Sequence, residues 1–174
     1  MEILYNFFVY GFIGWIIENI FSYYIHGHFQ KEGFLKGPFK PMYAIAMAWM
    51  LELYKIVPNI KFLIIISFII PTTVEYITGF VMRKFFNKDY WDYSKEKFNY
   101  EGIICLKFSI IWVILSVIDV KVIHPYFVYK IFDSINGIWP GLSILFILAL
   151  FMDEILTFID FRKGRQIILF KIKK

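Results

Sequence analysis

The sequence predicts an all-α integral membrane protein: a single bundle of about five transmembrane helices with a short helix at the membrane interface. Hydrophobic residues make up 59% of the 174 residues and aromatic residues 22%, well above the apolar content of soluble domains. A soluble chain of this length has too little interior to bury so many apolar side chains, whereas a bilayer lets them face lipid. The apolar residues also gather into separate runs, several of them about 20 residues long, which is enough to cross a hydrocarbon core.

Several other classes of protein are disfavoured. The net charge of +5 does not indicate a nucleic-acid partner, because the chain has no basic helix or basic-aromatic array. Cys105 is the only cysteine, which excludes an intrachain disulfide and a cysteine cluster for zinc. His26 and His28 would point to different faces of a helix, so we expect no metal or cofactor. The first apolar run lacks a basic start and continues past Glu18, which favours a retained span over a cleaved signal.

The first two predicted spans cover residues 3–25 and 41–57. In the first, Gly11 and Gly14 place two small residues where another helix could approach closely. The second is short and begins at Pro41. On length alone it could either cross the membrane or enter and return on the same side.

The other three predicted spans cover residues 62–82, 102–120 and 138–159. Pro71 lies in the middle of the third, where we expect a kink because proline cannot donate the helical hydrogen bond. Residues 123–137, between the last two spans, mix charged and aromatic side chains. That mixture is typical of a helix lying in the membrane interface.

The distribution of basic residues decides the topology. If all five spans cross, 14 basic residues lie on one side, in the loops at residues 26–40 and 83–101 and in the tail at residues 160–174, against four on the other. If the second span re-enters instead, the division is 11 to 7. Because cytoplasmic loops carry the excess of lysine and arginine, we expect five crossings of the cell membrane, with the amino terminus outside and the carboxyl terminus cytoplasmic.

Acidic side chains within the spans are the main candidates for a functional site. In this topology Glu18, Glu75, Asp153 and Glu154 lie at similar depths near the cytoplasmic ends of their helices, and Lys107 enters from the same side. An ionised side chain inside a span costs about 2.5–3.5 kcal/mol on insertion scales. We therefore expect these helices to turn the acids inward, with Lys107 offsetting part of their charge. The group either binds a solute, ion or proton, or forms structural ion pairs.

The two cytoplasmic loops carry the remaining candidates. Asp92 and Asn99 could bind a solute or ion, or could instead cap helices and fasten the loop together with Ser94. The glycines and prolines favour tight turns against the membrane face. The residues predicted to shape the loops or to contact a partner protein are Gly33, Gly37, Pro38, Pro41, Tyr43, Trp91, Tyr93 and Ser94.

Several short motifs occur along the first four spans: Gly14-Trp15-x-x-Glu18, Gly33-Phe34-Leu35-x-Gly37-Pro38-x-x-Pro41-x-Tyr43, Glu75, Trp91-Asp92-Tyr93-Ser94 and Phe98-Asn99-x-x-Gly102. Together with Asp153 in the last span, they resemble the CmpB-like ABC-transporter type IV family of bacterial membrane proteins. The resemblance implies a multi-span, permease-like protein. Because the chain has no Walker motif, an ATPase would have to be a separate chain.

We interpret the chain as a transporter or permease-like component that works as a homo-oligomer or with another subunit. Two alternatives stay open. One is an intramembrane enzyme acting on a lipid-linked substrate, with Glu18, Glu75 and Asp92 as acid, base or metal ligands. The other is a regulatory or scaffold subunit whose polar residues are structural. The sequence contains no nucleophile–base signature, which makes the enzyme the less favoured reading.

Overall fold

The computed structural model describes residues 1–29 and 33–172, with side chains described as far as residue 162. It is almost entirely helical, which confirms the predicted all-α class. The helices are α1 (Glu2–His26), α2 (Pro41–Ile56), α3 (Ile60–Val81), α4 (Leu106–Ile118), α5 (Tyr129–Ile135) and α6 (Trp139–Ile172). Two π-helical segments, η1 (Met82–Phe86) and η2 (Asp119–Val128), continue α3 and α4. Two short antiparallel strands, β1 (Asn99–Tyr100) and β2 (Ile104–Cys105), precede α4.

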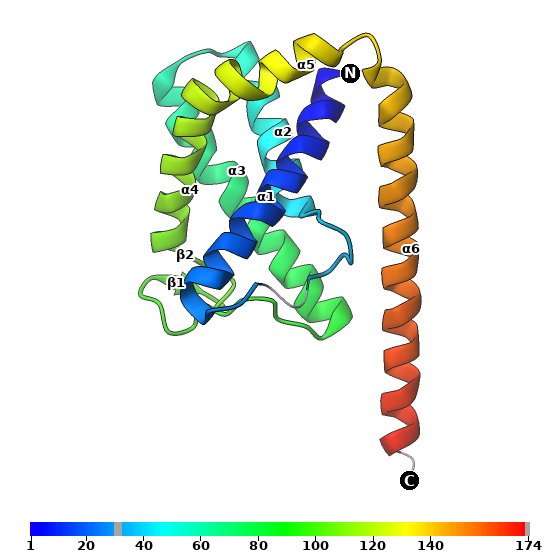
Figure 1. Ribbon diagram of the computed structural model, residues 1–174. Coiled ribbons are helices and arrows are strands. Elements are labelled where there is room, and N and C mark those ends of the chain that lie inside the picture. The colour runs from blue at the N-terminus through cyan, green and yellow to red at the C-terminus, as the bar shows by residue number, and fades with distance from the viewer. Residues whose placement is uncertain (30–32, 173–174) are drawn as a thin grey trace.

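Helices α1 to α4 form a bundle, α5 lies across one end of it, and α6 runs down its side (Figure 1). We call the end covered by α5 the α5 end, and the opposite end, where α1 joins α2 and α3 joins α4, the loop end. Three segments are long and apolar enough to cross a membrane: Glu2–His26, Ile60–Phe86 and Trp139–Arg162. The predicted interfacial segment corresponds to α5 and the second half of η2, while the five crossings and the side of each terminus stay predictions.

Helix α2 begins half-way along the bundle. The backbone N–H of Lys40 donates to the carbonyl of Gly11, near the middle of α1, at 2.9 Å. Residues 33–40 therefore rise from the loop end as irregular backbone before the helix starts (Figure 1). Pro41 suits the first turn of α2, where its missing N–H has no helical partner to lose. With 16 residues, α2 is about 24 Å long, so α2 and the rising segment together make the second passage through the bundle.

The predicted close approach at the α1 glycines is confirmed, and it explains where α2 begins. A Cβ atom at Gly11 would lie 2.1 Å from Cε2 of Phe39, and one at Gly14 would lie 2.3 Å from Cγ of Tyr43. Both distances are far shorter than any van der Waals contact. The two glycines therefore form a notch in α1 that receives the aromatic rings at the start of α2.

Helix α4 starts later than the predicted span at residues 102–120, because residues 99–105 form a hairpin instead. Gly102 turns the hairpin with φ of +68°, and a Cβ there would lie 2.8 Å from Oδ1 of Asp92. The first helical residue is consequently Leu106. At the side of α3, Thr72 donates to the hydroxyl of Ser109 at 2.9 Å, which ties the two helices together.

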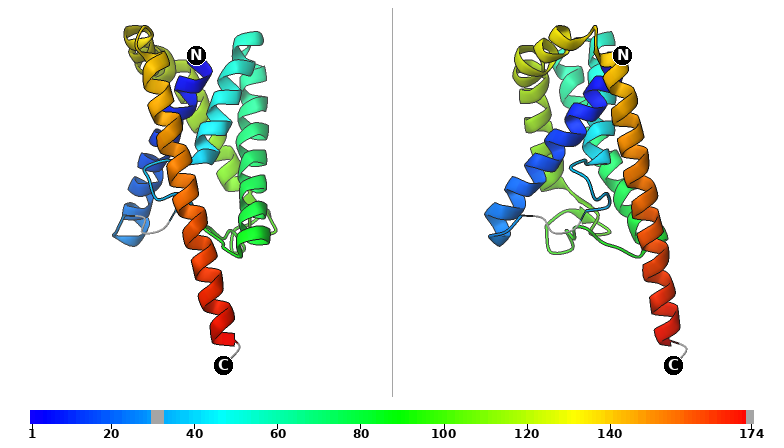
Figure 2. Two further views of the ribbon diagram at one scale, coloured as in Figure 1. Left: turned by 90° about the vertical axis from the view of Figure 1, so that its right-hand side faces the viewer. Right: turned by 45° about the vertical axis from the view of Figure 1, so that its right-hand side comes forward.

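Helix α6 contacts the rest of the chain at several points along its length, including both ends of the bundle. At the α5 end, Trp139 packs edge-on against Tyr5, with ring centroids 5.2 Å apart. At the loop end, Phe161 packs against Phe34 and Phe86. The two views of Figure 2 show α6 beside the bundle and reaching beyond its loops. The predicted basic tail at residues 160–174 is thus the end of this helix as far as Ile172, while residues 30–32 and 173–174 of the predicted loop and tail lie outside the described residues.

The notch in α1 gives a first prediction. Replacing Gly14 by alanine forces the Tyr43 side chain away at its root, close to the backbone, so we expect the free energy of unfolding to fall by about 1–3 kcal/mol, as overpacking does. Thermal unfolding in detergent, followed by tryptophan fluorescence, measures the change. Gly141→Ala is the matched control, because no atom lies within 4 Å of a Cβ at that position. Equal stability of the two variants would contradict the notch.

Candidate functional site

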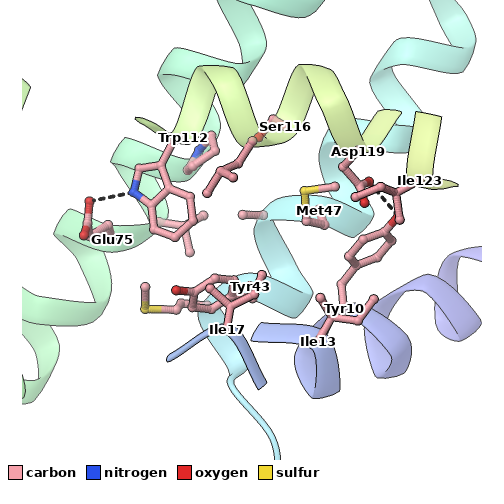
Figure 3. A pocket seen from close by; sticks show the side chains of 15 residues that line it. Tyr10, Ile13, Ile17, Tyr43, Met47, Glu75, Trp112, Ser116, Asp119 and Ile123 are labelled. Atoms are coloured by element: carbon pink, nitrogen blue, oxygen red, sulfur yellow. Dashed lines mark hydrogen bonds between the residues drawn. The ribbon is translucent and has the colours of Figure 1, made fainter. Parts of the chain in front are cut away.

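A cavity of about 130 Å³ lies in the middle of the bundle, between α1, α2, α3, α4 and the start of η2 (Figure 3). Most of its wall is aliphatic or aromatic. The charged residues in the wall are both acidic: Glu75 from α3 and Asp119 from η2. The other lining residues are Tyr10, Ile13, Ile17, Met42, Tyr43, Ala46, Met47, Pro71, Val74, Trp112, Leu115, Ser116 and Ile123.

Glu75 is the most deeply buried charged residue among those whose side chains the structure describes, with 2% of its surface exposed. The hydroxyl of Tyr93 donates to its Oε1 at 3.0 Å, and the indole N–H of Trp112 donates to its Oε2 at 3.2 Å. Each carboxylate oxygen therefore has a neutral donor. Within the described part of the chain, no lysine, arginine or histidine forms an ion pair with it.

Glu18 lies near Glu75 but has a cationic partner, because its carboxylate forms an ion pair with Lys40 and both side chains are largely buried. Tyr43 lies in the electrostatic field of both acids, and its ring meets Trp112 edge-on with the ring centroids 5.2 Å apart. Glu18 and Glu75 therefore lie close enough to interact electrostatically, while their joint role as a site stays a prediction. The structure adds Lys40 as the partner of Glu18, a pairing that depends on where α2 starts.

At the α5 end of the cavity, Asp119 accepts a hydrogen bond of 2.7 Å from the hydroxyl of Tyr10. That hydroxyl also lies 3.0 Å from Nδ1 of His124, which can donate to it when Tyr10 gives its one proton to Asp119. One turn earlier on α1, the buried amide of Asn6 has no hydrogen-bond partner among the described residues. The sequence analysis did not identify Asp119 and its partners, although Asp119 is an acid within the predicted span 102–120 and could have been noticed there.

Asp153 has a structural role at the side of the bundle. Its two oxygens accept the backbone N–H groups of Lys36 and Gly37, at 3.1 and 2.9 Å. We call these two hydrogen bonds the Asp153 contact; they join α6 to the rising segment that leads into α2. The adjacent Glu154 is exposed instead of turned inward.

The second loop is fastened from within. Asp92 accepts from the backbone N–H and the hydroxyl of Ser94, and these hydrogen bonds hold the pKa of the Asp92 carboxyl below its usual range. Asn99 donates to the carbonyls of Ser94 and Glu96 and accepts from the N–H of Gly102. Neither Asp92 nor Asn99 caps a helix. Their bonds shape the loop that presents Tyr93 to Glu75.

Two other predicted residues lie at the loop end. Lys107 is not where we expected it, and Trp91 anchors the loop. Lys107 pairs with Glu96 at 2.9 Å and is 58% exposed, instead of balancing the buried acids. The reason is that α4 begins at Leu106, which leaves Lys107 in the first turn beside the loop. Trp91 donates its indole N–H to the carbonyl of Ile103 at 2.7 Å and anchors the loop against β2.

The described residues contain no group of three histidine, cysteine, aspartate or glutamate side chains arranged to hold a metal ion. Glu18, Glu75 and Asp92 in particular have different surroundings. Glu18 is paired, Glu75 is buried between neutral donors, and Asp92 is exposed in the loop. The site therefore offers two separate carboxylates in an apolar cavity, one at each end.

A family model described as "Putative ABC-transporter type IV" matches residues 5–158, which is most of the chain. No curated protein and no solved structure matches the chain.

The Asp153 contact gives a second prediction. Asp153→Ala removes both acceptors of the Lys36 and Gly37 amides, and hydrogen bonds to a charged group contribute about 1.5–3 kcal/mol each. We expect hydrogen exchange in the peptide spanning residues 33–40 to accelerate at least about tenfold. Glu154→Ala, one residue along and exposed, is the control and should leave that peptide unchanged. Similar exchange in both variants would mean that the contact does not hold the segment.

Proposed function

The chain belongs to the family described as "Putative ABC-transporter type IV", and from this premise we propose that it is a transporter or permease-like membrane component whose solute site is the central cavity. The family description and the three long apolar helices support a membrane protein of transporter type. The observation that carries the solute site is the environment of Glu75.

A carboxylate without a cationic partner is costly to bury, and two neutral donors offset only part of that cost. A position that served packing alone could hold an uncharged amino acid, or an acid paired with a cation as Glu18 is. Position 75 holds an acid without such a partner. We infer that its charge is kept for a positive species, a cationic solute or a proton, which enters and leaves the cavity.

The start of α2 supports the same site. In membrane proteins, irregular backbone at mid-depth occurs where it is covered by protein or lines a cavity, and interrupted helices border the binding sites of many transporters. Here the irregular segment 33–40 ends at Pro41, and two lining residues, Met42 and Tyr43, belong to the first turn that follows. A shift of that segment would change the cavity wall directly.

We propose five crossings, with the amino terminus outside and the loop end in the cytoplasm. The positive-inside rule supports this arrangement, and the helices of the bundle alternate in direction as it requires (Figure 1). An ATPase on a separate chain would then meet the loop end, at the loops containing Gly37-Pro38 and Trp91 to Asn99. A homo-oligomer is a further expectation of this scheme.

The intramembrane enzyme is the weaker alternative, because its three proposed carboxylates do not face one space. Glu18 is occupied by Lys40, and Asp92 is held by Ser94 on the exposed side of the loop. Only Glu75 reaches the cavity. An acid–base pair acting on one substrate needs two groups within reach of the same atoms, and these residues do not provide it.

Glu75→Gln tests the proposed function. The glutamine keeps the size of the side chain and an acceptor for one donor but removes the charge, so we expect solute transport to fall at least tenfold while the unfolding temperature stays within a few degrees. Untargeted mass spectrometry of cells that carry the wild type, the variant or no protein identifies the solute and measures its transport.

Glu52→Gln is the matched control, since Glu52 pairs with Lys55 and does not line the cavity. Cells with this variant should match the wild type. A Glu75→Gln protein that sustains the wild-type solute profile, or that fails only because it unfolds, would contradict the proposed site.

The separate ATPase is tested by purifying the tagged protein from its native membrane in a gentle detergent. We expect a second chain with a Walker motif in stoichiometric amount. A photoreactive residue in place of exposed Lys95 should cross-link to it, whereas one in place of Tyr126, exposed at the α5 end, should not. Recovery of the protein alone would contradict coupling to an ATPase.

A further inference from the structure

The charges of the cavity restrict what it can hold. Its two charged lining residues are acidic, and they lie at opposite ends of the space, Glu75 beside Trp112 and Asp119 beside Tyr10 (Figure 3). An anion inside would be repelled from both ends at the short range and low dielectric of a bundle interior. A neutral ligand would leave both carboxylates without a counterion. A ligand that carries positive charge satisfies both constraints.

The rest of the wall restricts the form of that charge. A bare metal cation replaces its water with several oxygen ligands at once, whereas most of this wall is aliphatic or aromatic. Apart from the two carboxylates, side-chain oxygen in the wall comes only from the hydroxyls of Tyr10, Tyr43 and Ser116. The Tyr10 hydroxyl is already engaged with Asp119. Such a wall favours a cation that brings its own apolar cover.

Aromatic faces beside the acids fit the same chemistry. Trp112 and Tyr43 meet edge-on next to Glu75, and the Tyr10 ring flanks Asp119 at the other end (Figure 3). A cation over an aromatic face gains about 0.5–2 kcal/mol, most when water is excluded, and quaternary ammonium groups are commonly bound in this way. The aliphatic side chains between the two ends can cover alkyl or aryl groups.

We propose that the cavity binds a lipophilic organic cation, an ammonium ion with apolar substituents, with Glu75 as its first counterion and Asp119 as the second. This inference rests on the proposed function, because it takes the cavity as the solute site. The Trp112 and Tyr43 rings contact the charged head, and the aliphatic wall contacts the substituents. Asp119, held in place by Tyr10, attracts the positive charge from the α5 end.

Isothermal titration of the purified full-length protein with benzyltrimethylammonium tests the inference. The neutral N,N-dimethylbenzamide and the anionic benzenesulfonate, both of related size, are the comparison ligands. We expect saturable binding of the ammonium ion alone. The dissociation constant should rise at least about tenfold in Glu75→Gln and severalfold in Asp119→Asn, because each variant removes one counterion.

Two further variants separate charge from folding. Glu75→Asp keeps the charge and should stay within a few-fold of the wild type, and Glu52→Gln should bind as the wild type does. Equal binding of the neutral ligand, or ammonium binding that is indifferent to Glu75→Gln, would overturn the proposal. If no ammonium ion binds while Glu75→Gln still abolishes solute transport in cells, the ligand class is wrong and the proposed function stands. If neither effect occurs, both fail.

Discussion

The close contact between the middle of α1 and the start of α2 determines the arrangement of the whole site. Gly11 and Gly14 leave room for the rings of Phe39 and Tyr43. The carbonyl of Gly11 also accepts a hydrogen bond from the backbone N–H of Lys40. This backbone hydrogen bond matters in an apolar medium, where an unpaired N–H is costly. Because α2 begins at this height, Lys40 reaches Glu18 and the Tyr43 ring stands beside Trp112. If α2 began at the loop end instead, its first turns would occupy the place of the irregular segment 33–40.

The partners of the buried acids divide them into two kinds. Glu18 is satisfied by Lys40 and Asp153 by two backbone amides, so both are fully accounted for by contacts that hold the fold. Glu75 and Asp119 differ, because each faces the cavity and has only neutral donors or a histidine nearby. In the proposed scheme this distinction separates structural from functional carboxylates. The first pair has its countercharge or donors within the fold, and a bound ligand would supply the countercharge of the second pair.

The sequence could predict what depends on local composition and spacing. Apolar runs predict the helices, the glycine pair predicts a close approach, and the cost of a buried charge predicts that Glu18 and Glu75 turn inward. It could not predict features set by contacts between distant residues. The Tyr10–Asp119 hydrogen bond joins positions 109 residues apart, and the height at which α2 starts depends on the bond between Gly11 and residue 40. Lys107 was misplaced because the hairpin at residues 99–105, which delays α4, carries little apolar periodicity.

The Asp153 contact connects α6, at the side of the bundle, to the cavity wall through a short stretch of backbone. Asp153 holds Gly37, which lies three residues before Lys40, and α2 then carries Tyr43 into the wall one turn later. Two further contacts join α6 to the same segment, because Phe161 packs against Phe34 and Asp160 pairs with Lys36; a displacement of α6 or of the loop end would act on it directly. In the proposed scheme, a partner at the loop end would therefore reach Glu75 by moving the first turn of α2. The bundle of α1, α3 and α4 would not need to rearrange.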